Sequence, residues 1–97
     1  MHTIDNKTKD KIIALVTVLI PDVHIYLFGS RARGTNSEYA DIDIALDAGR
    51  PLATRDVDEV KNVLRESNII YIIDVVDIFK VTPVMKEEIL KDKVVWK

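Results

Sequence analysis

The spacing of apolar residues near the start of the chain predicts an amphipathic helix. Four of them fall at positions i, i+3, i+4 and i+7, the pattern of a helix that packs on one side only. These four are Ile12, Leu15, Val16 and Leu19. Pro21 cannot continue such a helix and is expected to end it.

Two stretches that follow have the composition and periodicity of β-strands. Val23–Phe28 is rich in β-branched and aromatic residues, which favour strands. Asp41–Leu46 alternates, and successive side chains of a strand point to opposite faces. One face is therefore expected to carry Ile42, Ile44 and Leu46, and the other Asp41, Asp43 and Ala45.

The segment between these strands predicts a short helical turn and a polar loop. Gly29 ends the first strand, and Ser30 stands where the N-cap of a helix would be. These residues predict a helical turn over Ser30–Arg33 that ends at Gly34. Thr35–Tyr39 then forms a polar loop.

The next part of the chain predicts a second helix and a third strand. Val57, Val60 and Leu64 share one face of a helix that ends near Asn68. Ile69–Phe79 is almost continuously apolar, as expected of a central strand that is buried on both faces.

A last helix is expected after this strand. Thr82 and Pro83 supply an N-cap and a proline at the first helical position, and the helix runs to about Lys91. A short extended tail, Val94–Trp96, follows. The order helix, strand, turn, strand, helix, strand, helix implies the α+β (mixed α/β) class, with a small mixed β-sheet flanked by helices.

Composition and charge narrow the classes of function. The chain has 97 residues, of which 47% are hydrophobic and 31% charged, so one domain over residues 1–97 is expected. A net charge of −2 gives no general attraction to nucleic acid or to an anionic membrane, and no direct DNA binding is expected. The absence of cysteine excludes thiolate metal sites. The longest apolar run, Ile12–Ile20, falls short of the roughly 20 residues that span a bilayer. We therefore expect a cytoplasmic protein.

Asp41 and Asp43 are candidate metal ligands because they project from one face of a strand. The strand rise puts them roughly 7 Å apart. Two carboxylates this close repel each other, which raises the apparent pKa of the pair. A divalent cation removes that repulsion and prefers oxygen ligands. The alternative is a half-buried strand whose polar face is simply in water.

Gly29 and Ser30 form a candidate anion site. A glycine between a strand and a helical turn lets a ligand approach the backbone, and the start of a helix offers free N–H groups. Arg31 and Arg33 place positive charge beside this turn, and arginine suits phosphate oxygens. The alternative is a capped turn with two solvated arginines. Together with the carboxylates, the turn supplies both parts that phosphoryl or nucleotidyl transfer needs.

At this point the chain resembles a known family. Gly29-Ser30, ten intervening residues and then Asp41-x-Asp43 are similar to the signature of the DNA polymerase β nucleotidyltransferase superfamily. Within it, the chain is most similar to the minimal nucleotidyltransferases, the MNT group. The resemblance covers nearly the whole chain and implies a fold like the polymerase β palm.

The resemblance also implies a third carboxylate on the strand after the middle helix. Asp74 and Asp77 are the candidates, and because they are three residues apart they face opposite sides of a strand. The apolar neighbours do not distinguish them. The family pattern favours Asp74, and Asp77 would then be an aspartate at the strand end that caps or pairs.

The function implied by the resemblance is nucleotidyl transfer with release of pyrophosphate. Asp41, Asp43 and Asp74 would bind two Mg²⁺ ions, and Gly29 and Ser30, with Arg31 or Arg33, would bind the phosphates of ATP or another nucleoside triphosphate. Members of the MNT group are usually encoded beside a helical HEPN-type partner. The expected activity is therefore that of an antitoxin that moves AMP onto a hydroxyl of this partner.

A second hypothesis is a non-catalytic module that binds nucleotide and neutralises its partner by forming a complex. Tyr39 and the tail Val94–Trp96 could then be contact points, unless they pack on their own domain. A template-using polymerase is disfavoured by the small size and negative charge of the chain. The base of the nucleotide, the acceptor and the oligomeric state have no signature in these motifs.

Overall fold

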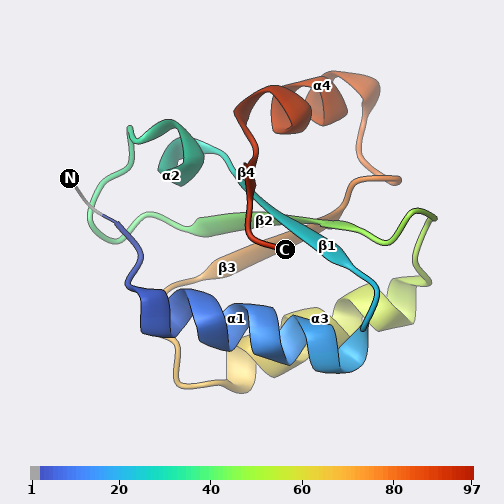
Figure 1. Cartoon of the computed structure of the whole chain (residues 1–97), viewed down its shortest axis with the longest axis horizontal. Helices are drawn as coiled ribbons and strands as arrows, with labels where there is room; N and C mark the ends of the chain where they lie inside the picture. The colour runs from blue at the N-terminus through green and yellow to red at the C-terminus, as the bar shows by residue number, and fades with distance from the viewer. Residues whose placement is uncertain (1–2) are drawn as a thin grey trace.

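A single mixed sheet with the strand order β3-β2-β1-β4 organises the chain (Figure 1). The computed structural model describes residues 3–97. Within this range the helices are α1 (Asn6–Leu19), α2 (Ser30–Arg33), α3 (Thr54–Glu66) and α4 (Pro83–Asp92). The strands are β1 (His24–Phe28), β2 (Ile42–Asp47), β3 (Ile73–Asp77) and β4 (Val94–Val95). This arrangement confirms the predicted class, a small mixed sheet flanked by helices.

The strand pairings explain the order of the sheet. β1 pairs antiparallel with both β2 and β4, whereas β2 pairs parallel with β3. Parallel neighbours need a long crossover, and here α3 provides it. The segment expected as a short extended tail contains β4, which forms the edge of the sheet opposite β3.

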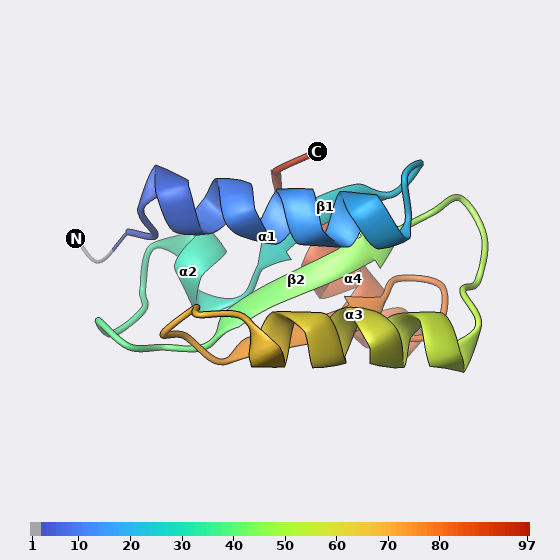
Figure 2. The same ribbon diagram turned by 90° about the horizontal axis from the view of Figure 1, so that it is seen from below.

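Helices cover the two faces of the sheet unequally. Figure 2 shows α1 and α3 side by side across one face, with α4 on the other side of the strands. α4 is a ten-residue helix, and α2 contributes only four residues at the end of β1. One face is therefore fully covered, and the other is covered only in part.

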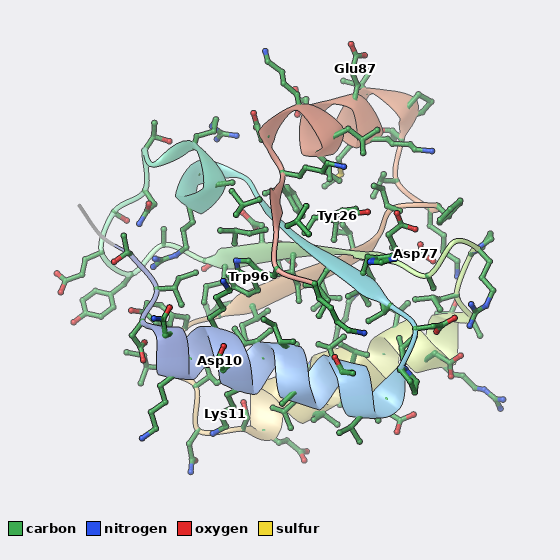
Figure 3. All side chains as sticks on the ribbon, in the orientation of Figure 1. Asp10, Lys11, Tyr26, Asp77, Glu87 and Trp96 are labelled. Carbon is green, nitrogen blue, oxygen red and sulfur yellow. The ribbon has the colours of Figure 1, made fainter. Side chains whose placement is uncertain are left out.

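The face toward α4 contains a small apolar cluster centred on Ala45, Ile78 and Ile89. Tyr26, labelled in Figure 3, packs against this cluster from β1. The sequence had placed Ala45 on a polar face. It is fully buried because α4 covers that end of β2. The face that carries Asp43 is therefore apolar at one end and polar at the other.

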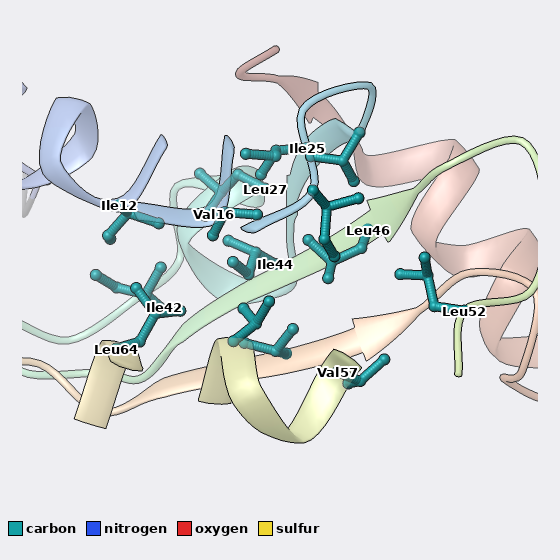
Figure 4. Close-up of a cluster of buried hydrophobic side chains, with 14 residues drawn as sticks. Ile12, Val16, Ile25, Leu27, Ile42, Ile44, Leu46, Leu52, Val57 and Leu64 are labelled. Carbon is teal, nitrogen blue, oxygen red and sulfur yellow. The ribbon is translucent and has the colours of Figure 1, made fainter. Parts of the chain in front are cut away.

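The main core lies between the sheet and the helices α1 and α3 (Figure 4). Ile42, Ile44 and Leu46 of β2 are all fully buried there, as their alternation predicted. Ile12 and Val16 of α1 pack onto them from one side. Val57, Val60 and Leu64 of α3 close the core from the other side.

The prediction of a central third strand was wrong. β3 is an edge strand, and it is shorter than the apolar run that suggested it. Ile70 and Ile72 lie before the strand and are 77% and 71% exposed. A continuous apolar run is compatible with burial on both faces but does not require it, because an edge strand is covered only where helices reach it.

The helix boundaries were predicted well where capping signals were present. Thr82 caps α4 and Pro83 is its first residue, as expected. α1 starts earlier than the apolar stripe suggested, because Asp5 caps a first turn that is wholly polar. Trp96 packs on the main core, whereas Tyr39 is 71% exposed. Across residues 3–97, α1 to α4 all lack the length and apolar character that crossing a membrane requires.

Candidate functional site

Gly29 brings the turn after β1 against the carboxylate of Asp43. Its φ of 78° and ψ of −157° lie in a region that only glycine adopts readily. A Cβ at this position would collide with Oδ2 of Asp43. Gly29, rather than the predicted Ser30, is the N-cap of α2, and the turn closes at Gly34 in the left-handed conformation as expected. The Gly-Ser turn and the D-x-D strand therefore meet directly.

Asp43 and Asp74 occupy paired positions on adjacent strands. They are register partners in the parallel pair of β2 and β3, so their side chains point to the same face. Their face is the one that α4 covers in part, because Ala45 and Val76, two residues further along each strand, belong to the cluster beneath α4. The carboxylates lie at the uncovered end, where Asp43 is half-buried and Asp74 is exposed.

Negative charge accumulates at Asp43. Burial raises the pKa of its carboxyl, and the nearby charges of Asp74 and Asp41 raise it further. The positive charge of Arg33 acts in the opposite direction and lowers this pKa. A half-buried carboxylate surrounded by two others is an environment that a divalent cation would relieve.

Asp41 lies just before β2 and is exposed. Its effect on Asp43 shows that the two side chains are near enough to interact electrostatically. Within residues 3–97, however, no three histidine or acidic side chains are already arranged as a set of metal ligands. The structure therefore brings Asp43 and Asp74 together by strand pairing, and leaves Asp41 on the adjoining loop.

The two arginines of the turn differ sharply in their surroundings. Arg33 has a half-exposed side chain, and its NH1 lies 2.8 Å from a carboxylate oxygen of Asp92 at the end of α4. Arg31 is only 8% exposed. It donates from Nε to the carbonyl of Ala40 and from NH2 to the carbonyl of Glu38. The guanidinium of Arg31 is thus engaged inside the protein, and that of Arg33 lies at the surface.

Asp77 serves a structural purpose. It is 4% exposed and its carboxylate accepts hydrogen bonds from the backbone N–H groups of Leu52, at 2.8 Å, and Phe79, at 2.9 Å. It lies at the end of β3 on the side opposite Asp74, near the loop that leads into α3 (Figure 3). Sequence alternation had predicted that only one of these two aspartates could join Asp43, and the register identifies that one as Asp74.

Two neighbours of the site had no signal in the sequence. Asp92 is 59 residues from Arg33, its ion-pair partner. Tyr71 lies beneath the guanidinium of Arg31, 4.7 Å from the ring centroid. Both contacts depend on how α4 and the segment before β3 fold onto the sheet, and neither residue type nor spacing indicates them.

Comparison with known proteins identifies similar chains. The family described as polymerase beta, nucleotidyltransferase, matches residues 10–97. The probable protein adenylyltransferase MntA of Haemophilus influenzae is 34% identical over 59 residues. That alignment covers 61% of this chain and 52% of the relative, so the match spans about half the length of that protein.

Solved structures share the fold over nearly the whole chain. A chain in a crystal structure of a toxin–antitoxin with AMP-PNP superposes with a TM-score of 0.78 at 31% identity, covering 92% of this chain and 72% of that one. Another belongs to the complex of a tri-AMPylated Shewanella oneidensis HEPN toxin with MNT antitoxin. Its TM-score is 0.74 at 28% identity, covering 94% of this chain and 70% of that chain.

Proposed function

The chain belongs to the polymerase β nucleotidyltransferase family, and from that premise we propose that it transfers AMP from ATP to a hydroxyl group of a HEPN-type toxin and thereby acts as an antitoxin. The relatives named for adenylyl transfer and for toxin–antitoxin complexes support this proposal.

One observation carries the proposal: the Gly29 turn is packed against Asp43 while Asp43 is paired in register with Asp74. A turn that admits close approach to the backbone and a pair of carboxylates thus share one uncovered end of the sheet. A triphosphate with its divalent cation requires both kinds of group at one place. If the turn were only a helix cap and the strand face only a solvated surface, nothing would require the two to be in contact.

The donor set suits Mg²⁺. Asp43 is destabilised in its ionised form by burial and by its acidic neighbours, and oxygen is the ligand that Mg²⁺ prefers. We assign Asp41, Asp43 and Asp74 as the residues that hold two Mg²⁺ ions. When bound, these ions supply the positive charge that neutralises the triphosphate and makes the acceptor hydroxyl more acidic.

The residues of the chain divide the remaining tasks. In this proposal Gly29 and Ser30 hold the phosphates that leave, and Arg33, whose side chain is half-exposed, neutralises them. The acceptor oxygen forms a bond to the α-phosphorus, the bond from that phosphorus to the bridging oxygen breaks, and pyrophosphate leaves with the electron pair. The proton of the hydroxyl passes to Asp74, the exposed carboxylate of the pair.

The experiment is to incubate the chain with ATP, Mg²⁺ and a HEPN-type toxin and to measure the mass of the toxin. The expected result is a gain of one or more AMP units on the toxin. Asp43→Asn is the matched control, because it keeps the shape of the side chain and removes the charge. No gain, or a gain that persists in the variant, would overturn the proposal, and binding of the toxin without transfer would favour neutralisation by complex formation.

A further inference from the structure

We infer that Arg31 is a positioning residue that fixes the loop bearing Asp41 relative to the paired carboxylates Asp43 and Asp74. This inference rests on the proposed function, since it concerns the same site. It assigns Arg31 no contact with phosphate. Its effect on the site passes through the backbone of the loop.

The contacts of the guanidinium converge on the residues just before Asp41. Nε of Arg31 donates to the carbonyl of Ala40 at 3.0 Å, and NH2 donates to the carbonyl of Glu38 at 2.9 Å. Ala40 is bonded directly to Asp41 in the chain. These two hydrogen bonds therefore tie the main chain to Arg31 just before it enters β2.

The same guanidinium also reaches the segment that leads to Asp74. It stacks 4.7 Å from the ring centroid of Tyr71, which lies three residues before Asp74. The next residue, Ile72, accepts a hydrogen bond from the backbone N–H of Ile42 at 2.9 Å, at the start of β2. Arg31 itself follows Gly29 by two residues. The side chain of Arg31 thus connects the Gly29 turn with the segments that lead into β2 and β3, the two strands that carry Asp43 and Asp74.

Arginine is suited to this task in a way that lysine is not. The planar guanidinium presents two donors in a fixed geometry and can stack on an aromatic ring at the same time, whereas an ammonium group is a single point of charge. The side chain is almost fully buried, and its NH1 is buried with no hydrogen-bond partner. Burying a cation with one donor unpaired lowers the stability of the fold. The contacts of Arg31 are therefore better explained by the position they give to the loop before Asp41 than by stability.

The consequence for the site is specific. The Asp43–Asp74 pair is held by backbone pairing of β2 with β3, and the hydrogen bonds of Arg31 go to residues before β2. Asp41 precedes β2 and has no strand partner. Loss of the guanidinium contacts should therefore free Asp41 while leaving the other two carboxylates in place. Metal affinity should fall but not vanish.

The test compares Arg31→Lys with Arg55→Lys in the whole chain. Arg55 is the matched control, because its side chain is 92% exposed on α3. The measurements are Mn²⁺ affinity by calorimetry, hydrogen exchange of the loop at residues 35–41, and unfolding temperature. Arg31→Lys is expected to weaken Mn²⁺ binding about tenfold and to speed exchange in the loop, since loss of a group that orients a metal ligand typically has an effect of this size. Arg55→Lys should match the wild type.

Tyr71→Leu provides a second variant in case Arg31→Lys does not fold. It removes the stacking surface and keeps both hydrogen bonds, so a smaller weakening of Mn²⁺ binding in the same direction is expected. Folded variants that bind Mn²⁺ as tightly as the wild type would overturn the positioning role, even if the loop exchanges faster. Failure of the wild-type chain to bind Mn²⁺ would overturn both this inference and the metal-dependent function. Wild-type binding of Mn²⁺ without AMP transfer would overturn the proposed function alone.

Discussion

Asp43 and Asp74 stand side by side on parallel strands, one half-buried and the other exposed. Their charges oppose each other, and the resulting repulsion raises the pKa of Asp43 in addition to the effect of burial. Backbone pairing of β2 and β3 holds this arrangement in place despite the repulsion. The fold therefore keeps unfavourable electrostatic energy beside the Gly29 turn, which packs against the Asp43 carboxylate.

This relationship predicts that Asp43→Asn stabilises the metal-free chain at neutral pH and strongly slows transfer. The folded-state pKa of Asp43 is raised, so the folded chain binds this proton more tightly than the unfolded chain does. Its contribution to stability is present at pH values below the ordinary range of an aspartate and is lost as pH rises through the raised pKa. Asparagine does not ionise and avoids that loss. Transfer should fall on the order of 10³-fold.

Thermal unfolding in the absence of metal checks the stability part of this prediction. The variant should unfold a few degrees above the wild type at pH 7, and the difference should shrink as the pH falls below the ordinary pKa of an aspartate, about 3.9, where the carboxyl becomes protonated in both states. Added Mg²⁺ should stabilise the wild type and leave the variant almost unchanged, because only a folded site that binds the ion gains from it. A variant less stable than the wild type at neutral pH would contradict the argument.

Gly29→Ala should cost more than Gly34→Ala, because Gly29 combines a backbone conformation that is less accessible to alanine with a collision. Both glycines have positive φ, 78° and 75°, but a Cβ at Gly34 meets nothing within 4 Å, whereas one at Gly29 strikes Asp43. Gly34→Ala should lower the free energy of unfolding by about 1 kcal/mol. Gly29→Ala should lower it further, by about 2–3 kcal/mol, and should displace the carboxylate. Chemical denaturation and Mn²⁺ titration measure the two effects, and equal losses of metal affinity in both variants would count against the contact.

Much of the fold and part of the site could be predicted from the sequence, because they depend on local periodicity. The period of two along β2 placed Ile42 and Ile44 in the core, and the same period along β3 required that Asp74 and Asp77 face opposite ways. Thr82 and Pro83 located the start of α4. These features follow from the geometry of a single element and need no knowledge of its neighbours.

The remainder depends on contacts between distant elements. Periodicity along one strand carries no information about which strand lies at the edge, so the apolar run ending at Phe79 predicts a central strand although β3 is an edge strand. It also did not reveal that α4 would bury Ala45. The sequence does not distinguish Arg31 from Arg33, but the guanidinium of Arg31 is buried against a loop and that of Arg33 is half-exposed. Only tertiary packing distinguishes these cases.

Asp92→Asn should increase the affinity of the chain for nucleotide. Arg33 and Asp92 form an ion pair at 2.8 Å that occupies the exposed cation of the candidate phosphate site. Removing the carboxylate charge releases the guanidinium of Arg33, which is 50% exposed, from Asp92, which is 18% exposed. A pair at the surface is worth about 0.2–1 kcal/mol, and its loss corresponds to a decrease in the dissociation constant for ATP of up to about fivefold. The free energy of unfolding should change little. The variant loses the ion pair, but it also loses a negative charge at the C-terminal end of α4, where the helix dipole disfavours negative charge.

Asp22→Asn is the matched control for this change. Asp22 pairs with Arg50 at 3.0 Å, away from the candidate site, and its carboxylate is more exposed than that of Asp92, at 60% against 18%. It should alter stability by a similarly small amount and leave nucleotide affinity as it was. Fluorescence titration with a labelled ATP analogue provides the comparison. Weaker binding by Asp92→Asn would mean that the ion pair holds Arg33 in its working position, contrary to the prediction.

Asp74→Asn and Asp77→Asn should have opposite effects, although the residues are three positions apart. Asp77 is buried and its carboxylate accepts two backbone hydrogen bonds. An amide would point an N–H₂ group at one of these donors, so Asp77→Asn should lower the free energy of unfolding by ~2 kcal/mol and leave transfer per folded molecule near the wild-type rate. Asp74 is exposed and lies beside Asp43. Asp74→Asn should therefore keep or slightly raise stability and reduce transfer by about 10²-fold or more. Urea denaturation and AMP transfer, measured on the same preparations, give both quantities. If Asp77→Asn lost transfer while remaining as stable as the wild type, the assignment of the third carboxylate would have to be reversed.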